Sequence, residues 1–419
     1  MARWLYTALL YLALPVILLR LWWRGRKAPA YRLRWRERLG FVPRQGTRPL
    51  WIHGVSVGET VAIAPLVELL LARHPDLPLL LTTTTPTGSQ RVRALFGDRV
   101  QHVYCPWDLP DALGRFLRRT RPLGCIIVET ELWPNLVHAC QGAAVPVLLA
   151  NARLSARSAR GYARFAALTR PMLQRLDRVV AQHDSDGERF VALGLPAQQL
   201  SISGSIKLDI EIRPQWLEAG ARLRALWGER PVLVAGSTHE GEDAALLRVL
   251  RHLRGPFPDL LLVLVPRHPE RFESVYCLCC DAGWTVARHS EPGARAAADV
   301  YLVDTMGELM GVYAAADVAF VGGSLVPRGG HNPLEPAALG KPVLMGQQVF
   351  NFQAICDALE RAGGLVRVAD EQALTRELQR LLADRSLRER EGRAARAFIE
   401  QNRGALERLY REVAAMLRL

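Results

Sequence analysis

The stretch WIHGVSVGETVAIAPL, residues 51–66, holds one carboxylate, Glu59, in a position where it could do chemistry. An apolar run ends at His53 and Gly54, and Glu59 follows a short turn, directly before a second apolar run. A carboxylate held rigidly at such a place can take a proton from a substrate hydroxyl. A structural interpretation also exists, because an acid in the first turn of a helix is stabilised by the helix dipole. Motifs in the rest of the sequence are needed to distinguish the catalytic from the structural interpretation.

Other polar motifs follow predicted strands in the same half of the chain. ETELWPN (129–135), NARLS (151–155) and GSIK (204–207) come after the fourth, fifth and seventh of these strands. Because ligands of parallel α/β sheets bind beyond the carboxyl ends of the strands, we expect these motifs to gather near Glu59. His53 is interpreted as a packed residue at a strand end rather than as a catalyst.

A glycine-rich segment of the second half, VGGSLVPRGGHNPLEPAALGKP (321–342), suits an anionic ligand. Its glycines permit tight turns and a close approach of the backbone to a ligand. HNPLEPAALG then predicts a helix with Asn332 as N-cap and Pro333 in its first turn, and free N–H groups there would bind an anion. Glu335, one turn in, could accept hydrogen bonds from ribose hydroxyls. The alternative is that the glycines only tighten a loop.

The basic motif VPRHPER (265–271) follows another predicted strand. Arg267, His268 and Arg271 suit a phosphate, although a solvated basic turn is an equal alternative. No GxGxxG or Walker pattern follows the first strand of the chain, which argues against dinucleotide-binding and P-loop proteins.

The motif DTMGEL (304–309) could also serve a nucleotide. Gly307 and the amides after it could approach a phosphate or a base. The alternative is a helix start capped by Asp304 or Thr305.

The elements that position these motifs alternate between apolar and amphipathic segments, which predicts parallel α/β sheets. Helices are predicted, for example, at 61–73, 111–119 and 187–193. The predicted strands of the first half lie at 50–53, 77–82, 101–105, 124–128, 145–150, 178–181 and 200–203. The alternation of apolar and amphipathic segments begins again at 230–243, and further strands are predicted at 260–265, 285–287, 300–303, 318–321 and 342–345.

Two Rossmann-like domains therefore follow a short anchor, and we expect ligands in the cleft between facing sheets. The predicted parts are an anchor (1–27), an N-terminal domain (28–212), a linker (213–230), a C-terminal domain (231–400) and a C-terminal helix (401–419).

The first residues predict a membrane anchor. The apolar run from Trp4 to Leu19 is near the short limit for spanning a bilayer, and Leu21 to Trp23 extend it. Basic residues follow it at Arg20, Arg24, Arg26, Lys27, Arg32, Arg34, Arg36 and Arg38. The positive-inside rule then keeps the rest of the chain in the cytoplasm. A cleaved signal peptide is disfavoured, because its cleavage region would be bulky and charged. A buried helix, a spanning helix and an interfacial helix stay open.

Composition limits the partners. The chain has 419 residues, of which 49% are hydrophobic, and a formal charge of +13. Such a surface suits anionic membranes or phosphorylated substrates. No RRM, zinc-finger or basic-zipper pattern occurs, so we expect no nucleic-acid partner. The cysteines are scattered, and the cluster CLCC (277–280) lacks the second half of a metal site.

Taken in order, the motifs HGVSVGE, ETELWPN, NARLS, GSIK, VPRHPER, DTMGEL and GGHNPLEPAALGKP resemble the 3-deoxy-D-manno-octulosonic acid (Kdo) transferases of lipopolysaccharide synthesis. The resemblance runs from the apolar N-terminus to about Phe352 and weakens in the helical tail. EPAALGKP alone would indicate only the wider GT-B glycosyltransferases.

The resemblance implies a GT-B fold and an inverting transfer of Kdo from CMP-Kdo to a lipid A precursor (lipid IVA) at the cytoplasmic side of the inner membrane. It implies no metal and no cofactor apart from the donor substrate. It makes Glu59 the general base, and Glu129 and Lys207 electrostatic stabilisers of the transition state. The helix dipole would tend to keep Glu59 ionised. The implied CMP-binding positions are Pro266, Arg267, Met306, Gly307, Glu308, Asn332, Pro333, Leu334 and Glu335.

Two other functions stay open on the sequence. One is a GT-B transferase or epimerase with a different nucleotide-sugar donor, which would share the glycine-rich loop but not the complete set of motifs. The other is a non-catalytic membrane module that binds an anionic lipid, for which Glu59 would be dispensable.

Overall fold

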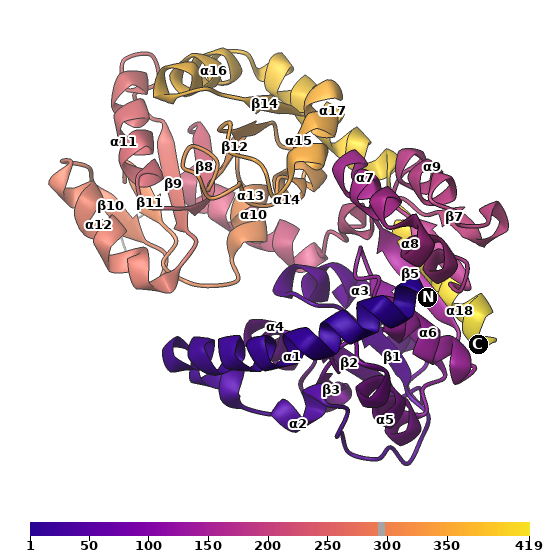
Figure 1. The fold of residues 1–419 in the computed structure, drawn as a ribbon. Coiled ribbons are helices and arrows are strands. Elements are labelled where there is room, and N and C mark those ends of the chain that lie inside the picture. The colour runs from indigo at the N-terminus through magenta and orange to yellow at the C-terminus, as the bar shows by residue number, and fades with distance from the viewer. Residues whose placement is uncertain (292–297) are drawn as a thin grey trace. The chain divides into compact units, whose positions relative to one another are not determined.

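The structure is a computed structural model that describes residues 1–291 and 298–419 (Figure 1). The chain forms two compact units, Met1–Asp209 with Arg403–Leu419, and Ile210–Asn402. Each unit is built on one seven-stranded sheet, and every pair of neighbouring strands is parallel. The two parallel α/β domains expected from the sequence are confirmed.

In the first unit the strand order is β3-β2-β1-β4-β5-β6-β7. The strands are β1 Leu50–His53, β2 Leu79–Thr83, β3 Gln101–Tyr104, β4 Gly124–Val128, β5 Val147–Ala152, β6 Arg178–Ala181 and β7 Leu200–Ile202. Every residue of β1 is buried, because helices cover both faces of a parallel sheet. The order reverses at the β1–β4 pair, and at such a switch point the carboxyl ends of the strands leave a crevice for a ligand.

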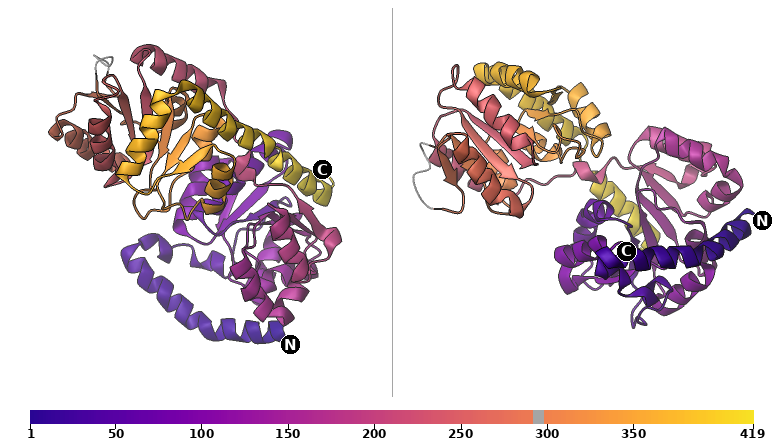
Figure 2. Two further views of the ribbon diagram at one scale, coloured as in Figure 1. Left: turned by 90° about the horizontal axis from the view of Figure 1, so that it is seen from above. Right: turned by 60° about the vertical axis from the view of Figure 1, so that its left-hand side comes forward.

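Helices cover the two faces of this sheet, as Figure 2 shows. Trp51 belongs to a core cluster on one face that includes residues of α5, α6, α8 and α9, whereas Ile52 belongs to a cluster on the other face that includes residues of α3, α4 and α18. The helices are α3 Val57–Arg73, α4 Pro86–Phe96, α5 Pro110–Thr120, α6 Pro134–Gly142, α7 Ala156–Arg164, α8 Ala166–Leu173, α9 Asp184–Ala192 and α18 Ala405–Leu417.

In the second unit the strand order is β10-β11-β9-β8-β12-β13-β14, with the reversal at β8 and β12. The strands are β8 Val232–Thr238, β9 Leu261–Pro266, β10 Val286–Arg288, β11 Val300–Leu302, β12 Val318–Val321, β13 Val343–Met345 and β14 Leu365–Arg367. The helices are α10 Pro214–Trp227, α11 Glu242–Leu253, α12 Phe272–Asp281, α13 Leu309–Ala314, α14 Leu334–Ala338, α15 Gln353–Arg361, α16 Glu371–Ala383 and α17 Arg385–Gln401.

The domain boundaries differ from the predicted ones at two places. Residues 213–230 are no linker, because α10 belongs to the second unit and packs against α13. The contact is close, since a Cβ on Gly220 would lie 2.5 Å from the Cβ of Ala314. The C-terminal helix α18 packs in the first unit, against α3, β5 and β6. The chain therefore returns to the first unit after Asn402.

The N-terminal helix α1, Ala2–Lys27, lies along the first unit (Figure 1). By length and composition it could cross a membrane, and most of its apolar side chains are exposed. One side of the helix is tied to the unit. Tyr6 donates a hydrogen bond to Asp108 (2.9 Å), Thr7 to Asn135 (3.1 Å) and Tyr11 to Asp111 (2.6 Å).

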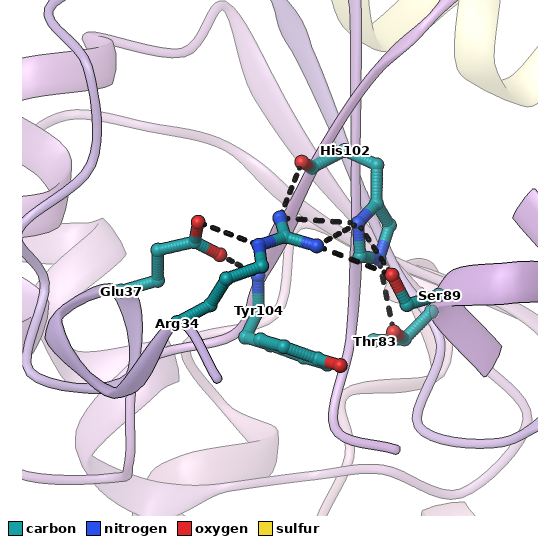
Figure 3. A network of polar contacts seen from close by, with 6 residues as sticks. All are labelled: Arg34, Glu37, Thr83, Ser89, His102 and Tyr104. Carbon is teal, nitrogen blue, oxygen red and sulfur yellow. Dashed lines mark hydrogen bonds and ion pairs between the residues drawn. The ribbon is translucent and has the colours of Figure 1, made fainter. Parts of the chain in front are cut away.

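A polar network fixes the segment that follows α1 to the sheet (Figure 3). Arg34 donates hydrogen bonds to Glu37 (2.8 Å), to Ser89 (3.2 Å) and to the carbonyl of His102 (2.8 Å). Glu37 in turn accepts one from the amide of Tyr104 (2.8 Å), and Arg34 lies over the Tyr104 ring. Both ends of the anchor segment are therefore held to the first unit.

Candidate active site

Glu59 lies in the first turn of α3, directly after the carboxyl end of β1. Ser56 caps the helix, and its hydroxyl accepts a hydrogen bond from the Glu59 amide (3.3 Å). The Glu59 carboxylate accepts hydrogen bonds from the amides of Ser56 (2.9 Å) and Val55. This reciprocal capping box fixes the orientation of the side chain, which is 9% exposed.

The environment of Glu59 suits a base that works near neutral pH. Burial raises the pKa of Glu59 to about 7, and the negative charges of Glu131 and Glu129 add to that shift, while the hydrogen bonds from Ser56 and Val55 oppose it. The expectation that the helix dipole keeps this carboxylate ionised is wrong, because removal from water dominates. A carboxylate with such a pKa is a stronger base than an ordinary glutamate.

Glu129 and Lys207 form an ion pair at the same edge of the sheet. The Lys207 amine lies 2.9 Å from the Glu129 carboxylate. Glu129 follows β4 and has a φ of 59°, a left-handed conformation that is uncommon for a residue with a side chain. Asn151, at the end of β5, has a φ of 52°, and its side chain accepts a hydrogen bond from the amide of Ile206 (3.3 Å). The motifs ETELWPN, NARLS and GSIK are thus brought together.

A third carboxylate of this edge, Glu131, was not singled out from the sequence. Burial raises the pKa of Glu131, which accepts a hydrogen bond from the Trp133 indole (3.1 Å). His53 packs edge-on against Trp133 and its ring contacts the Thr82 hydroxyl at 2.9 Å. Burial lowers the pKa of His53 to about 4, so the ring is a neutral core group, as the sequence indicated.

The second unit holds a cavity of about 290 Å³ beyond the carboxyl ends of its strands. The cavity is lined by seven predicted nucleotide-binding residues, namely Pro266, Arg267, Met306, Gly307, Glu308, Asn332 and Glu335. Ser237, Thr305, His331 and Phe352 also line it, and none of them was predicted from the sequence to bind a nucleotide. Five segments that are distant in the sequence therefore form one site.

Two predicted positions do not line this cavity. Pro333 is the N-cap of α14, and Leu334 is 1% exposed in the core. The helix begins at Leu334 rather than directly after Asn332, so the predicted cap is displaced. Asn332 still accepts a hydrogen bond from the Leu334 amide (3.2 Å) and donates one to Glu335 (3.2 Å). Pro333 and Leu334 therefore hold the backbone from which Asn332 and Glu335 extend into the cavity.

Among the described residues that line the cavity, Arg267 is the one arginine, and Glu308 and Glu335 are the two acids. Burial raises the pKa of Glu335, and the nearby positive charge of Arg267 opposes this. Arg267 is exposed and makes no side-chain hydrogen bond or ion pair with the residues that the structure describes. Arg271, in contrast, is bound to buried Asp243 and donates to the Thr238 carbonyl (3.0 Å), so it stabilises the loop. Of these two arginines, Arg267 is the one available to a ligand.

A buried acid, Glu242, organises the loops around this cavity. Its fully buried carboxylate accepts hydrogen bonds from the amides of His239 (2.9 Å), Gly323 (2.7 Å), Ser324 (3.0 Å) and Leu325 (3.0 Å). It therefore joins the GSTHEGED segment to the glycine-rich segment, a role that the sequence did not reveal.

Comparisons with known proteins agree with this arrangement. The family model for 3-deoxy-D-manno-octulosonic-acid transferase (kdotransferase) matches residues 33–210. A 3-deoxy-D-manno-octulosonic acid transferase of Haemophilus influenzae is 44% identical over 98% of this chain and 97% of its own. One of Bordetella pertussis is 39% identical over 97% and 98%. The structure of a UDP-GlcNAc 2-epimerase from Neisseria meningitidis, with a TM-score of 0.57 and 13% identity over 89% of this chain and all of its own, shows the fold alone. Since two transferases match over nearly their whole lengths, the chain belongs to the family of 3-deoxy-D-manno-octulosonic acid (Kdo) transferases, which are glycosyltransferases.

Proposed function

We propose that this protein transfers Kdo from CMP-Kdo to the lipid A precursor lipid IVA, with inversion and without a metal, in the core pathway of lipopolysaccharide synthesis. The observation that carries the proposal is Glu59, a rigidly held carboxylate with a pKa of about 7 at the carboxyl edge of the first sheet. The resemblance to Kdo transferases supplies the substrates.

In this reaction the acceptor hydroxyl attacks the anomeric carbon of Kdo on the face opposite the departing CMP. Glu59 takes the hydroxyl proton as the new carbon–oxygen bond forms. The bond from the anomeric carbon to the phosphate oxygen breaks, and its electron pair leaves with CMP. A positioned general base typically contributes about 10²–10⁴-fold in rate. The inversion follows from this single displacement.

Lys207 stabilises negative charge on the reacting groups, and Glu129 orients the Lys207 amine. A lysine amine can neutralise the carboxylate of the sugar or the charge that develops on the phosphate. Glu129 fixes the direction of this amine through the 2.9 Å ion pair. The strained backbone at Glu129 supports a functional role, since non-glycine residues with positive φ concentrate at active sites.

The cavity of the second unit is the proposed donor site. Its volume of about 290 Å³ is near the lower limit for ligand pockets and suits the CMP part of the donor. Arg267 would bind the phosphate, and Glu335 and Asn332 offer acceptors and a donor for the hydroxyl groups of the ribose.

The inner membrane is the proposed location, with the two units in the cytoplasm. Helix α1 exposes Trp4, Leu9, Leu12, Val16 and Leu19 to the surroundings, as an anchor requires. The acceptor is itself a lipid, so an enzyme held at the bilayer meets it without extracting it from the membrane.

The test is incubation of the purified protein with CMP-Kdo and the tetraacyl disaccharide bisphosphate. We expect release of CMP and a product heavier by Kdo. A protein that releases no CMP contradicts the proposal. Protection against heating by CMP but not by UDP separates this donor from that of the UDP-sugar enzymes with the same fold.

A further inference from the structure

The first unit contains a cavity of about 880 Å³ that is lined along the lengths of α5 and α6. We call it the arginine groove and define it by Arg48, Arg118 and Arg121 on its rim and by Trp4, Leu117 and Val145 on its apolar surface. Arg48 lies just before β1, and Arg121 lies just before β4. The groove therefore runs along α5 and α6: its arginines lie toward the amino ends of the strands, and Pro110 and Asn135 line it at the starts of these two helices.

The charge of the groove is wholly positive. No acidic residue lines it among the residues that the structure describes. Arg118 and Arg121 are exposed, and their side chains form no hydrogen bond or ion pair with any described residue. Arg48 is held by the carbonyls of Arg121 (3.2 Å) and Pro122 (3.4 Å), which leaves its charge uncompensated.

A neighbouring hollow extends this positive surface. It measures about 550 Å³, and Arg118 and Arg121 line both cavities. Arg44, Arg115 and Arg119 add three more guanidinium groups there, of which Arg115 pairs with Asp111 and Arg119 donates to the Val42 carbonyl. Such a concentration of arginine with free N–H groups is typical of phosphate recognition.

The apolar part of the groove indicates what kind of phosphate it suits. Trp4, which is 66% exposed, offers surface for hydrocarbon, which an inorganic phosphate or a sugar phosphate would leave unused, and the buried residues Leu117 and Val145 lie beneath the groove. Trp4 belongs to the first turn of α1, the helix with the exposed apolar residues. The groove is thus continuous with the part of the protein suited to a bilayer.

We propose that the arginine groove binds the headgroup and upper acyl region of an anionic glycerophospholipid of the membrane. The phosphate contacts the Arg118 and Arg121 guanidinium groups, and the glycerol and upper chain lie on Trp4. The arginines that would hold the phosphate of the lipid lie toward the amino ends of the strands, whereas the proposed base follows the carboxyl end of β1. This inference rests on the proposed membrane location and is independent of the transfer chemistry.

The test uses the full-length protein and vesicles of phosphatidylcholine, with or without phosphatidylglycerol. The variant Arg118→Gln/Arg121→Gln removes two free charges from the groove. Its control, Arg376→Gln/Arg390→Gln, removes two exposed charges from α16 and α17 of the second unit. Since each basic residue at an anionic surface contributes about 1 kcal/mol, we expect the groove variant to lose about 10- to 30-fold in partitioning to anionic vesicles.

The expected pattern has three parts. The groove variant binds phosphatidylcholine vesicles like the parent, the control keeps its binding to anionic vesicles, and both variants unfold at the temperature of the parent. Equal losses in the two variants would mean general charge attraction and would overturn the proposal. Inorganic phosphate that stabilises the parent but not the groove variant, in the absence of lipid, would assign the groove to a soluble anion and would also overturn it. Transfer to a detergent-dispersed acceptor, measured in parallel, reports on the proposed function separately.

Discussion

Replacement of Glu59 by glutamine should remove a particular feature of the pH–rate profile. With a pKa of about 7, roughly a tenth of the carboxyl groups are ionised at pH 6 and roughly nine tenths at pH 8. If Glu59 is the base, kcat/KM of the parent should therefore rise about 10-fold between these two pH values. An ordinary glutamate, with a pKa near 4.3, would give almost no change over this range.

The assay is CMP release from CMP-Kdo at low acceptor concentration, followed from pH 5 to pH 9. Glu59→Gln should be slower by about 10²–10⁴-fold at pH 8. It should also lose the limb of the pH–rate profile near pH 7, that is, the rise in kcat/KM as Glu59 ionises. A limb that persists in this variant, or a limb of the parent centred near 4.5, would refute the assignment.

Two further variants test the cause of the raised pKa. Glu131→Gln removes a neighbouring negative charge, so the limb should move to lower pH while the plateau rate changes little. Glu188→Gln removes an exposed acid from α9 of the same unit and should leave the limb in place. A limb that moves equally in both variants would show that the net charge of the unit, rather than Glu131, sets this pKa.

The pH dependence of the free energy of unfolding should also reflect the ionisation of Glu59. A carboxyl whose pKa is higher in the folded than in the unfolded state contributes stability below about pH 4.5, and this contribution is lost as the pH rises through about 7. A glutamine can still accept a capping hydrogen bond. We therefore expect Glu59→Gln to unfold at no lower temperature than the parent at pH 8. A large loss of stability there would mean that the slow rate has a structural cause.

Substitutions at three other positions, one of them with a matched control, have expected outcomes. Glu129→Ala and Glu129→Gly should both lose activity, but the glycine variant should be about 1 kcal/mol more stable in thermal unfolding, because φ at this position is 59°; equal stability would contradict the strain. Arg267→Ala should weaken the protection by CMP against heating by about 10-fold in CMP concentration, since a charge-assisted phosphate contact is lost; unchanged protection would place the phosphate elsewhere. Glu242→Ala should lower the free energy of unfolding by about 3 kcal/mol or more, because four amides lose their acceptor, whereas Glu240→Ala on the exposed side of the same loop should stay within about 0.5 kcal/mol; similar losses in both would contradict the role given to Glu242.

The sequence was sufficient to predict the sheets and the places where their strands end. Fully apolar runs such as residues 124–128 can form buried parallel strands, and polar motifs directly after them mark the carboxyl edge. The strand β14 was missed, because its three residues, Leu365–Arg367, are too few to show a period. The return of α18 to the first unit was missed as well, since an amphipathic helix does not indicate which sheet it will cover.

Properties of the site that depend on tertiary contacts could not be predicted. The position of Glu59 before a helix was visible in the sequence, but its burial and the nearby charge of Glu131 were not, so the direction of its pKa shift was wrong. The contact of His331 with the cavity of the second unit likewise depends on tertiary packing. His331 lies 2.8 Å from His239, a residue that is distant in the sequence.

The most direct test of the central claim is a single-turnover comparison of the parent and Glu59→Gln, each saturated with CMP-Kdo and mixed with the lipid acceptor at pH 8. Both proteins should show the same protection by CMP, which reports on an intact second unit. The parent should form the Kdo-containing lipid with release of one CMP, and the variant should do so about 10²–10⁴-fold more slowly. Equal rates in the two proteins would contradict the claim that Glu59 takes the proton of the acceptor.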